Sequence, residues 1–267
     1  MQTIFKVLLA VLISFSLHSC EDKIDVNLND ADPRVVIEAD LTNLSRNQEI
    51  KISRTVAFDE NRAFEPVDQA EVIVRSSTGR VYTFESIGNG KYRHANMMVN
   101  AMQEYTLLVR LDGKEYTATS RAPRFVEIDS MGITKETILN DDYYFINLSF
   151  DDPGGEDNYY KYSISTNGEP FKFNTVFSDK FNDGLHVKHQ LGGRNIEFEN
   201  GDSINLRRYS LAKDVYTYWS EYQSTNPGSA SPANPKSNIS NGALGYFGVS
   251  TVKEYKITIQ DEDGLSQ

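Results

Sequence analysis

Short runs of alternating apolar and polar residues, separated by turn residues, recur along most of the chain. In one run Ala70, Val72 and Val74 share a face, because successive side chains of a strand point to opposite faces. Asp112-Gly113 has the composition of a tight hairpin turn. About six or seven such strands fit into about ninety residues, which predicts a β-sandwich of the immunoglobulin-like or transthyretin-like type.

The interruption at Pro123 divides the strands into two predicted domains, residues 33–122 and 123–267. One segment of the second domain differs from the rest, because its apolar residues recur at helical spacing behind Ser210, a suitable N-cap. A helix is therefore predicted near residues 211–223. The predicted fold is mainly β, with two β-sandwich domains and one short covering helix on the second.

The predicted helix carries several aromatic residues. Val215, Trp219 and Tyr222 are expected to seat it on the sandwich, since aromatic side chains dominate such cores. Tyr218 lies off this apolar face. The next residues, 224–241, are rich in serine, proline, glycine and asparagine, which is typical of a long loop. Because long loops are commonly functional, Tyr218 and this loop form the predicted partner surface.

Cys20 is the only cysteine and stands directly behind a short apolar segment. Lys6 precedes that segment and Ser19 ends it, so residues 1–19 have the parts of a secretory signal peptide. The segment is too short to cross a bilayer, which takes roughly 20 helical residues. We expect a lipoprotein with acyl chains such as palmitate on Cys20 and an acidic flexible tether at residues 20–32. The alternative is a free cysteine behind an ordinary signal peptide.

The charge balance is acidic, with 27 lysine and arginine residues against 38 aspartate and glutamate residues and a formal net charge of −11. Nucleic-acid-binding proteins normally carry a basic surface, so no nucleic-acid partner is expected. Electrostatic attachment to anionic lipid needs clusters of basic residues. Attachment to a membrane must therefore come from the lipid on Cys20.

Several short phrases occur in a characteristic order along the chain. They are Cys20-Glu21-Asp22, residues 33–39, Ala70-Glu71-Val72, Gly90-Lys91-Tyr92, residues 150–154, Asn158-Tyr159-Tyr160, residues 179–184, Gly201-Asp202, residues 216–219, Asn234-Pro235 and residues 242–247. Together they resemble a Bacteroidota surface lipoprotein family catalogued as domain of unknown function 4249. The resemblance covers nearly the whole chain after Cys20.

The resemblance implies a surface-exposed outer-membrane lipoprotein that acts by binding. Members of the family are similar to accessory lipoproteins encoded beside TonB-dependent transporters of the starch-utilisation type. The implied partners are the outer membrane, reached through the lipid anchor, a TonB-dependent transporter and its substrate-binding lipoprotein. Glu21 and Asp22 resemble an acidic signal for export to the cell surface, although a charged tether would look the same. The alternative function is an envelope or adhesion lipoprotein without a transport partner.

The sequence lacks two common signatures of hydrolytic enzymes. It has no Gly-x-Ser-x-Gly nucleophile elbow and no His-Glu-x-x-His zinc motif. The resemblance supplies no catalytic residues either. We therefore expect no enzymatic activity and no cofactor.

Two acidic segments of the sequence resemble places where a metal could bind. Asp151, Asp152 and Asp157 crowd one turn and could hold calcium, although a solvated acidic turn is the favoured interpretation. Residues 179–184 imitate the start of an EF-hand loop, but a phenylalanine takes a ligand position and Gln190 replaces the bidentate glutamate, so that motif is rejected.

Two histidines, His186 and His189, lie three residues apart in a segment that looks extended. This spacing places their side chains on opposite faces of a strand. We therefore expect surface or loop histidines here and no shared metal.

Overall fold

A computed structural model describes residues 33–56, 64–192, 196–225 and 234–260, all of which fall in one of the chain's two compact units. The predicted signal peptide, the tether with Cys20, Glu21 and Asp22, and residues 226–233 of the predicted loop lie outside these ranges.

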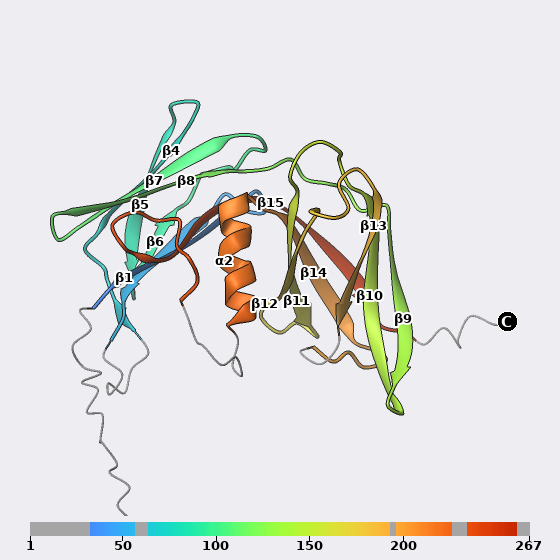
Figure 1. Ribbon diagram of the computed structural model, residues 1–267. Helices are drawn as coiled ribbons and strands as arrows, with labels where there is room; N and C mark the ends of the chain where they lie inside the picture. The colour runs from blue at the N-terminus through green and yellow to red at the C-terminus, as the bar shows by residue number, and fades with distance from the viewer. Residues whose placement is uncertain (1–32, 57–63, 193–195, 226–233, 261–267) are drawn as a thin grey trace, which may run out of the picture. The chain divides into compact units, whose positions relative to one another are not determined.

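Strands make up most of the described chain (Figure 1). The first half contains β1 (Val35–Thr42), β2 (Gln48–Arg54), β3 (Glu65–Pro66), β4 (Glu71–Ser76), β5 (Val81–Gly88), β6 (Lys91–His94), β7 (Glu104–Leu111) and β8 (Lys114–Arg121). The second half contains β9 (Ser130–Ile138), β10 (Asp141–Asp151), β11 (Tyr159–Thr166), β12 (Lys172–Ser178), β13 (His186–Gly192), β14 (Ser203–Ser210), helix α2 (Lys213–Ser224) and β15 (Leu244–Thr258). The predicted mainly β fold class is confirmed.

The first half forms a sandwich because β5 takes part in two layers. Its residues 81–84 pair with β4, while residues 85–88 pair with β6. One layer therefore contains β1, β2 and β6, and the other contains β4, β7 and β8. The β7–β8 turn at Asp112-Gly113 has positive φ at both residues, as the sequence predicts.

The second half is also layered. A three-stranded sheet, in the order β13-β10-β9, packs on β11 and β14 of the larger sheet. Ile146 and Leu148 of β10 and Tyr162 of β11 are fully buried between these layers. The second half is thus a sandwich, as the predicted fold class states, and most residues of β10 and β11 are buried.

The last strand, β15, belongs to both sheet regions. Residues 244–250 pair in parallel with β1, whereas residues 251–258 pair antiparallel with β14. The predicted division into residues 33–122 and 123–267 therefore assigns to the second domain a strand whose first half extends the sheet of the first.

Gly245 allows β15 to lie against β1. Its φ is +85°, and a Cβ at this position would collide with the backbone carbonyl of Ile37. Glycine adopts positive φ without steric cost and leaves room for a close backbone approach.

The helix forms two residues later than predicted, and Ser210 is not its cap. Ser210 is the buried last residue of β14, and Ala212 occupies the N-cap without a side-chain hydrogen bond. The helix packs against β11, β12 and β15. Helix α2 is the one α-helix within the described ranges. No helix in these ranges is long and apolar enough to span a membrane.

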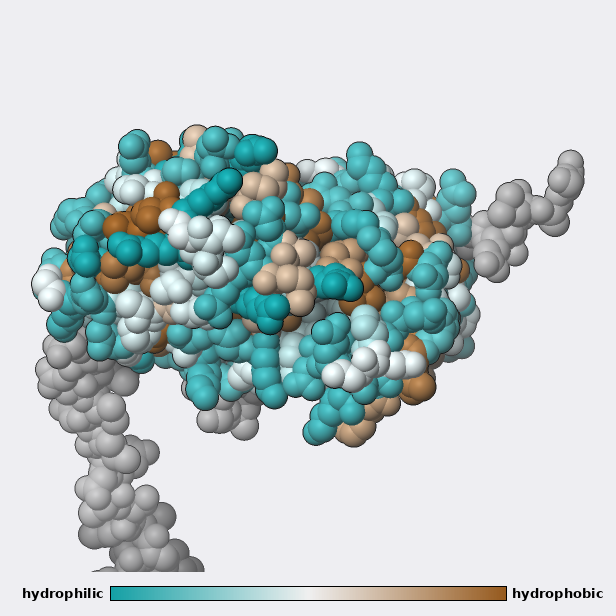
Figure 2. All heavy atoms as spheres, turned by 90° about the horizontal axis from the view of Figure 1, so that it is seen from above, coloured by the Kyte–Doolittle hydropathy of each residue, from teal (hydrophilic) through white to brown (hydrophobic). Residues whose placement is uncertain are grey.

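The outer face seen in Figure 2 is mainly hydrophilic, with apolar residues in separate small patches. This distribution agrees with the acidic composition of the chain. A surface of this kind is typical of a protein that is exposed to water.

Candidate functional site

Two loops of the second half meet beside the first turn of α2. One connects β10 to β11 and the other connects β12 to β13. Their backbones are tied together at both ends: Asp152 N donates to Leu185 O at 2.9 Å, and Asp179 N donates to Asn158 O at 3.1 Å. We call the two connections, residues 152–158 and 179–185, the paired loops.

Two glycines let the paired loops approach closely. A Cβ added to Gly154 would lie 3.3 Å from the Cα of Gly184. Gly184 also has a φ of +70°, in the left-handed region that favours glycine. The two glycines thus allow a close backbone contact that a Cβ atom would crowd.

Three carboxylates converge where the paired loops meet. They belong to Asp152, Asp179 and Asp183, and one oxygen of each lies within 4.8 Å of the others. Asp152 and Asp179 are buried, whereas Asp183 is exposed. We call this group the Asp152 cluster.

Each carboxylate of the cluster accepts a hydrogen bond through one oxygen. Tyr160 Oη donates to Asp152 Oδ1 at 2.5 Å, and Asn158 N donates to Asp179 Oδ2 at 2.6 Å. Gly155 N donates to Asp183 Oδ1 at 2.8 Å. These donors fix the orientation of the three carboxylates.

The other oxygen of Asp152, Oδ2, is buried and has no hydrogen-bond partner within the described ranges. Burial raises the pKa of the Asp152 carboxyl, and the negative charges of Asp179 and Asp183 raise it further. Hydrogen bonds from Tyr160 and from the backbone N–H of Gly184 act in the opposite direction. The environment of Asp152 therefore disfavours an isolated negative charge.

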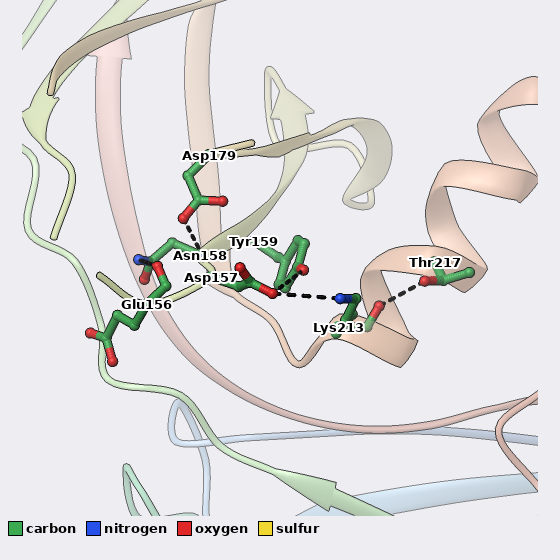
Figure 3. A network of polar contacts seen from close by, with 7 residues as sticks. All are labelled: Glu156, Asp157, Asn158, Tyr159, Asp179, Lys213 and Thr217. Carbon is green, nitrogen blue, oxygen red and sulfur yellow. Dashed lines mark hydrogen bonds and ion pairs between the residues drawn. The ribbon is translucent and has the colours of Figure 1, made fainter. Parts of the chain in front are cut away.

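A second polar network joins the paired loops to the helix (Figure 3). Asp157 Oδ2 accepts a hydrogen bond from Tyr159 Oη at 3.1 Å and lies 3.5 Å from Lys213 Nζ. Thr217 Oγ1 donates to the carbonyl of Lys213 at 2.9 Å, which fixes the first helical turn. Glu156 points away from this network (Figure 3).

These groups border an open surface cleft of about 810 Å³. Its walls come from the paired loops and the first turn of α2, and include Asp157, Tyr159, Asp183 and Lys213. The cleft thus combines acidic groups, a lysine and an aromatic ring, the kinds of group that recognise polar molecules.

The structure separates the three calcium candidates of the sequence. Asp152 belongs to the cluster, but Asp151 is exposed and lies 2.7 Å from His186 Nδ1, and Asp157 faces Lys213. The weaker alternative, one calcium ion held by these three residues of a single turn, is therefore not supported, because Asp151 and Asp152 belong to different groups of carboxylates. The other two members of the cluster come from the rejected EF-hand-like segment, and only the fold brings them to Asp152.

The two histidines lie on opposite faces of β13, as predicted, but His189 is buried rather than at the surface. Its Nδ1 lies 2.8 Å from Tyr162 Oη, and its ring stacks on Phe177 with the centroids 4.0 Å apart. Burial, assisted by the positive charge of Arg208, lowers the pKa of His189 to about 3. The ring is therefore neutral at ordinary pH.

Arg208 is a buried cation that the sequence pattern does not reveal. Its guanidinium lies over the rings of Phe150 and Tyr160, at 4.0 Å and 4.4 Å from their centroids. Nε donates to Tyr162 Oη at 3.1 Å, and the backbone carbonyl of Val126 accepts another hydrogen bond. This cation contacts the aromatic core below the paired loops and forms no ion pair with a carboxylate among the described residues.

Tyr218 is not exposed in the way the helical spacing predicts. Its ring packs on Tyr246 of β15, with centroids 4.7 Å apart, and burial raises its pKa to about 12. Tyr222 instead presents 44% of its surface, so the predicted assignment of the two rings is wrong.

Part of the predicted loop lies firmly against the helix. Asn238 Nδ2 donates to Asp214 at 2.5 Å and to Phe247 O at 2.8 Å, while Lys236 N donates to Glu221 at 2.5 Å. The described end of the loop is therefore ordered by side chains of α2 and by β15.

The comparison with protein families decides the classification. A family model described as a domain of unknown function, DUF4249, matches residues 21–256. The chain belongs to the DUF4249 family. The match includes the paired loops, α2 and most of β15, and the family resemblance drawn from the sequence phrases is confirmed.

Other comparisons add little about this DUF4249 protein. A two-domain fibronectin type III segment from chicken tenascin is similar at 14% identity, with 85% of this chain and 99% of that chain covered and a TM-score of 0.24. At this score the likeness carries no argument. No curated protein sequence matches the chain.

Proposed function

We propose that this DUF4249 protein is an outer-membrane lipoprotein that faces the extracellular side and acts by binding. The observation that carries the proposal is Cys20, directly behind an apolar segment and a small residue. We further propose that it is an accessory component of a TonB-dependent uptake system of the starch-utilisation type in Bacteroidota. Its partners would be the transporter and the substrate-binding lipoprotein of that system.

The cleft beside the paired loops supports a binding role rather than a catalytic one. Asp157, Tyr159 and Lys213 are hydrogen-bonded or ion-paired with one another, at 3.1 Å and 3.5 Å. Groups held in this way can recognise a polar partner by exchanging these contacts for new ones. We therefore assign no catalytic role to them.

The proposed partner surface is the outer edge of α2 together with the loop that follows it. Tyr222 is the exposed ring of this surface and contacts Phe173 and Trp219, whereas Tyr218 packs on Tyr246. Exposed aromatic side chains often contribute strongly to protein interfaces.

Co-purification tests the proposed partners. The native protein, extracted in mild detergent, should bring down a TonB-dependent transporter and its substrate-binding lipoprotein. Tyr222→Ala should reduce the recovery of these partners by roughly tenfold, as expected for loss of an interface anchor worth over 1 kcal/mol.

Phe64→Ala provides a matched control, because Phe64 is also 44% exposed but lies in the first half of the chain. It should leave recovery of the partners unchanged. If the native protein brings down no transporter, the alternative of an envelope or adhesion lipoprotein replaces the uptake role.

A further inference from the structure

We propose that the Asp152 cluster is a calcium-binding site, formed by Asp152, Asp179 and Asp183. This inference goes beyond the proposed uptake role and does not depend on it. It rests on the geometry of the paired loops and on the buried, unpartnered Oδ2 of Asp152.

The first argument is charge. Three carboxylates have oxygens within 4.8 Å of one another, and two of the three residues are buried. None of them forms an ion pair with a lysine, arginine or histidine in the part of the chain that the structure describes. Buried carboxylates are normally paired or bound to a metal, because burial of an unpaired charge is costly.

The second argument is orientation. Asp152 receives its hydrogen bond from Tyr160, while Asp179 and Asp183 each receive one from a backbone N–H of the opposite loop. Each donor occupies one oxygen and holds the carboxylate in place. Outer hydrogen bonds of this kind commonly orient the ligands of metal sites. At Asp152 the remaining oxygen, Oδ2, is buried and accepts no hydrogen bond from the residues that the structure describes.

The third argument identifies the cation. The cluster offers only carboxylate oxygens, which suit hard cations and not zinc or copper. Calcium accepts six to eight oxygens in irregular geometry, whereas magnesium requires a near-ideal octahedron. Two irregular loops that share three carboxylates fit calcium better, and the exposed Asp183 gives the ion and its waters access from solvent.

Calcium at this position would join the two loops, because Asp152 lies on one loop and Asp179 and Asp183 lie on the other. Asp183 also borders the surface cleft, next to Asp157 and Lys213. The ion would therefore stabilise one wall of the cleft.

The test uses the intact protein, stripped with a chelator and then titrated with calcium chloride alone. Calorimetry should detect one binding event, and the thermal midpoint should rise with calcium concentration, since a ligand of the folded state stabilises it. Magnesium chloride at equal concentration should raise the midpoint less. An absence of binding and of any thermal shift would overturn the proposal.

Two variants locate the site. Asp183→Asn removes the exposed carboxylate and should weaken calcium binding roughly tenfold or more, because affinity follows the charge of the ligand set. Asp152→Asn should abolish the thermal shift caused by calcium. The amide of this variant keeps an oxygen that can accept the hydrogen bond from Tyr160, and its NH₂ group places a donor among the remaining carboxylates. In the presence of chelator, the thermal midpoint of the variant should therefore equal or exceed that of the native protein.

Asp151→Asn is the matched control, since it is the same substitution at the adjacent residue. Asp151 belongs to a separate, fully exposed group with Asp129 and His186. This variant should bind calcium as the native protein does. A calcium response that survives in Asp152→Asn, or that is lost equally in Asp151→Asn, would contradict the assignment.

Discussion

His189 illustrates how the burial of one side chain makes the stability of the fold depend on pH. Its pKa is about 3 in the folded chain, against an ordinary value of 6.5, so the unfolded chain binds an additional proton between these values. The contribution of the neutral His189 ring to the free energy of unfolding is fully present above pH 6.5. It falls as the pH drops towards 3, by about 1.4 kcal/mol for each pH unit.

His189→Gln should remove this part of the pH dependence. Glutamine cannot titrate, but its amide can still form a hydrogen bond with Tyr162. Urea unfolding gives the free energy of unfolding at pH 6.5 and at pH 4.5. The decrease between these two pH values should be roughly 2–3 kcal/mol larger in the native protein than in the variant. Equal losses in the two proteins would mean that His189 is not the titrating group.

Residue-level features differ in how far the sequence can reveal them. The helical spacing correctly places Val215 in the core. It misplaces Tyr218, because the ring that covers it belongs to Tyr246, which is distant in the sequence. The Asp152 cluster is hidden for the same reason: its members come from two loops, and sequence spacing cannot show which loops meet.

At the scale of elements, the contact between β1 and β15 depends on Gly245. Gly245→Ala should destabilise the protein by roughly 2–4 kcal/mol, since it combines positive φ with a collision against the Ile37 carbonyl. Equilibrium unfolding in urea measures the change.

Gly79→Ala separates the two causes. Gly79 has a similar φ of +84°, but a Cβ there would meet no atom within 4 Å. Gly79→Ala should lower the free energy of unfolding only by the backbone strain, about 1 kcal/mol. If both substitutions cost the same, close approach to β1 is not what Gly245 provides.

The elements themselves were largely predictable. Alternation identified strands such as β4 and β7, and helical spacing identified α2 to within two residues. The pairing of β15 with β1 was not predictable, because its partners lie more than two hundred residues apart and a strand pattern does not name its neighbour. The lack of a side-chain cap at Ala212 was equally hidden, since packing on β11 and β12 can replace capping.

At the scale of the whole molecule, anchoring and orientation can be tested on intact cells. Cys20→Ala should release the protein from the membrane, because no lipid can be attached. Glu21→Ala combined with Asp22→Ala should keep the lipid but leave the protein facing the periplasm. One acyl chain alone binds membranes only marginally, with a partition constant of roughly 10⁴ M⁻¹, so stable anchoring requires several chains on Cys20.

External protease provides the measurement for this prediction. It should digest the native protein on intact cells and spare the variant that lacks the two acidic residues. Both proteins should be digested after the outer membrane is permeabilised. Equal digestion of both on intact cells would show that Glu21 and Asp22 do not direct surface export.

The shared strand β15 also determines when the chain can complete its fold. The edge of β1 that faces away from β2 remains without its partner until residues 244–250 arrive. Contacts between such distant segments are slow to form, because a long loop must close first. For a protein that we propose to be exported, we expect the first sandwich to be completed only after residues 244–250 have been delivered, which would favour an unfolded, threadable chain during its passage.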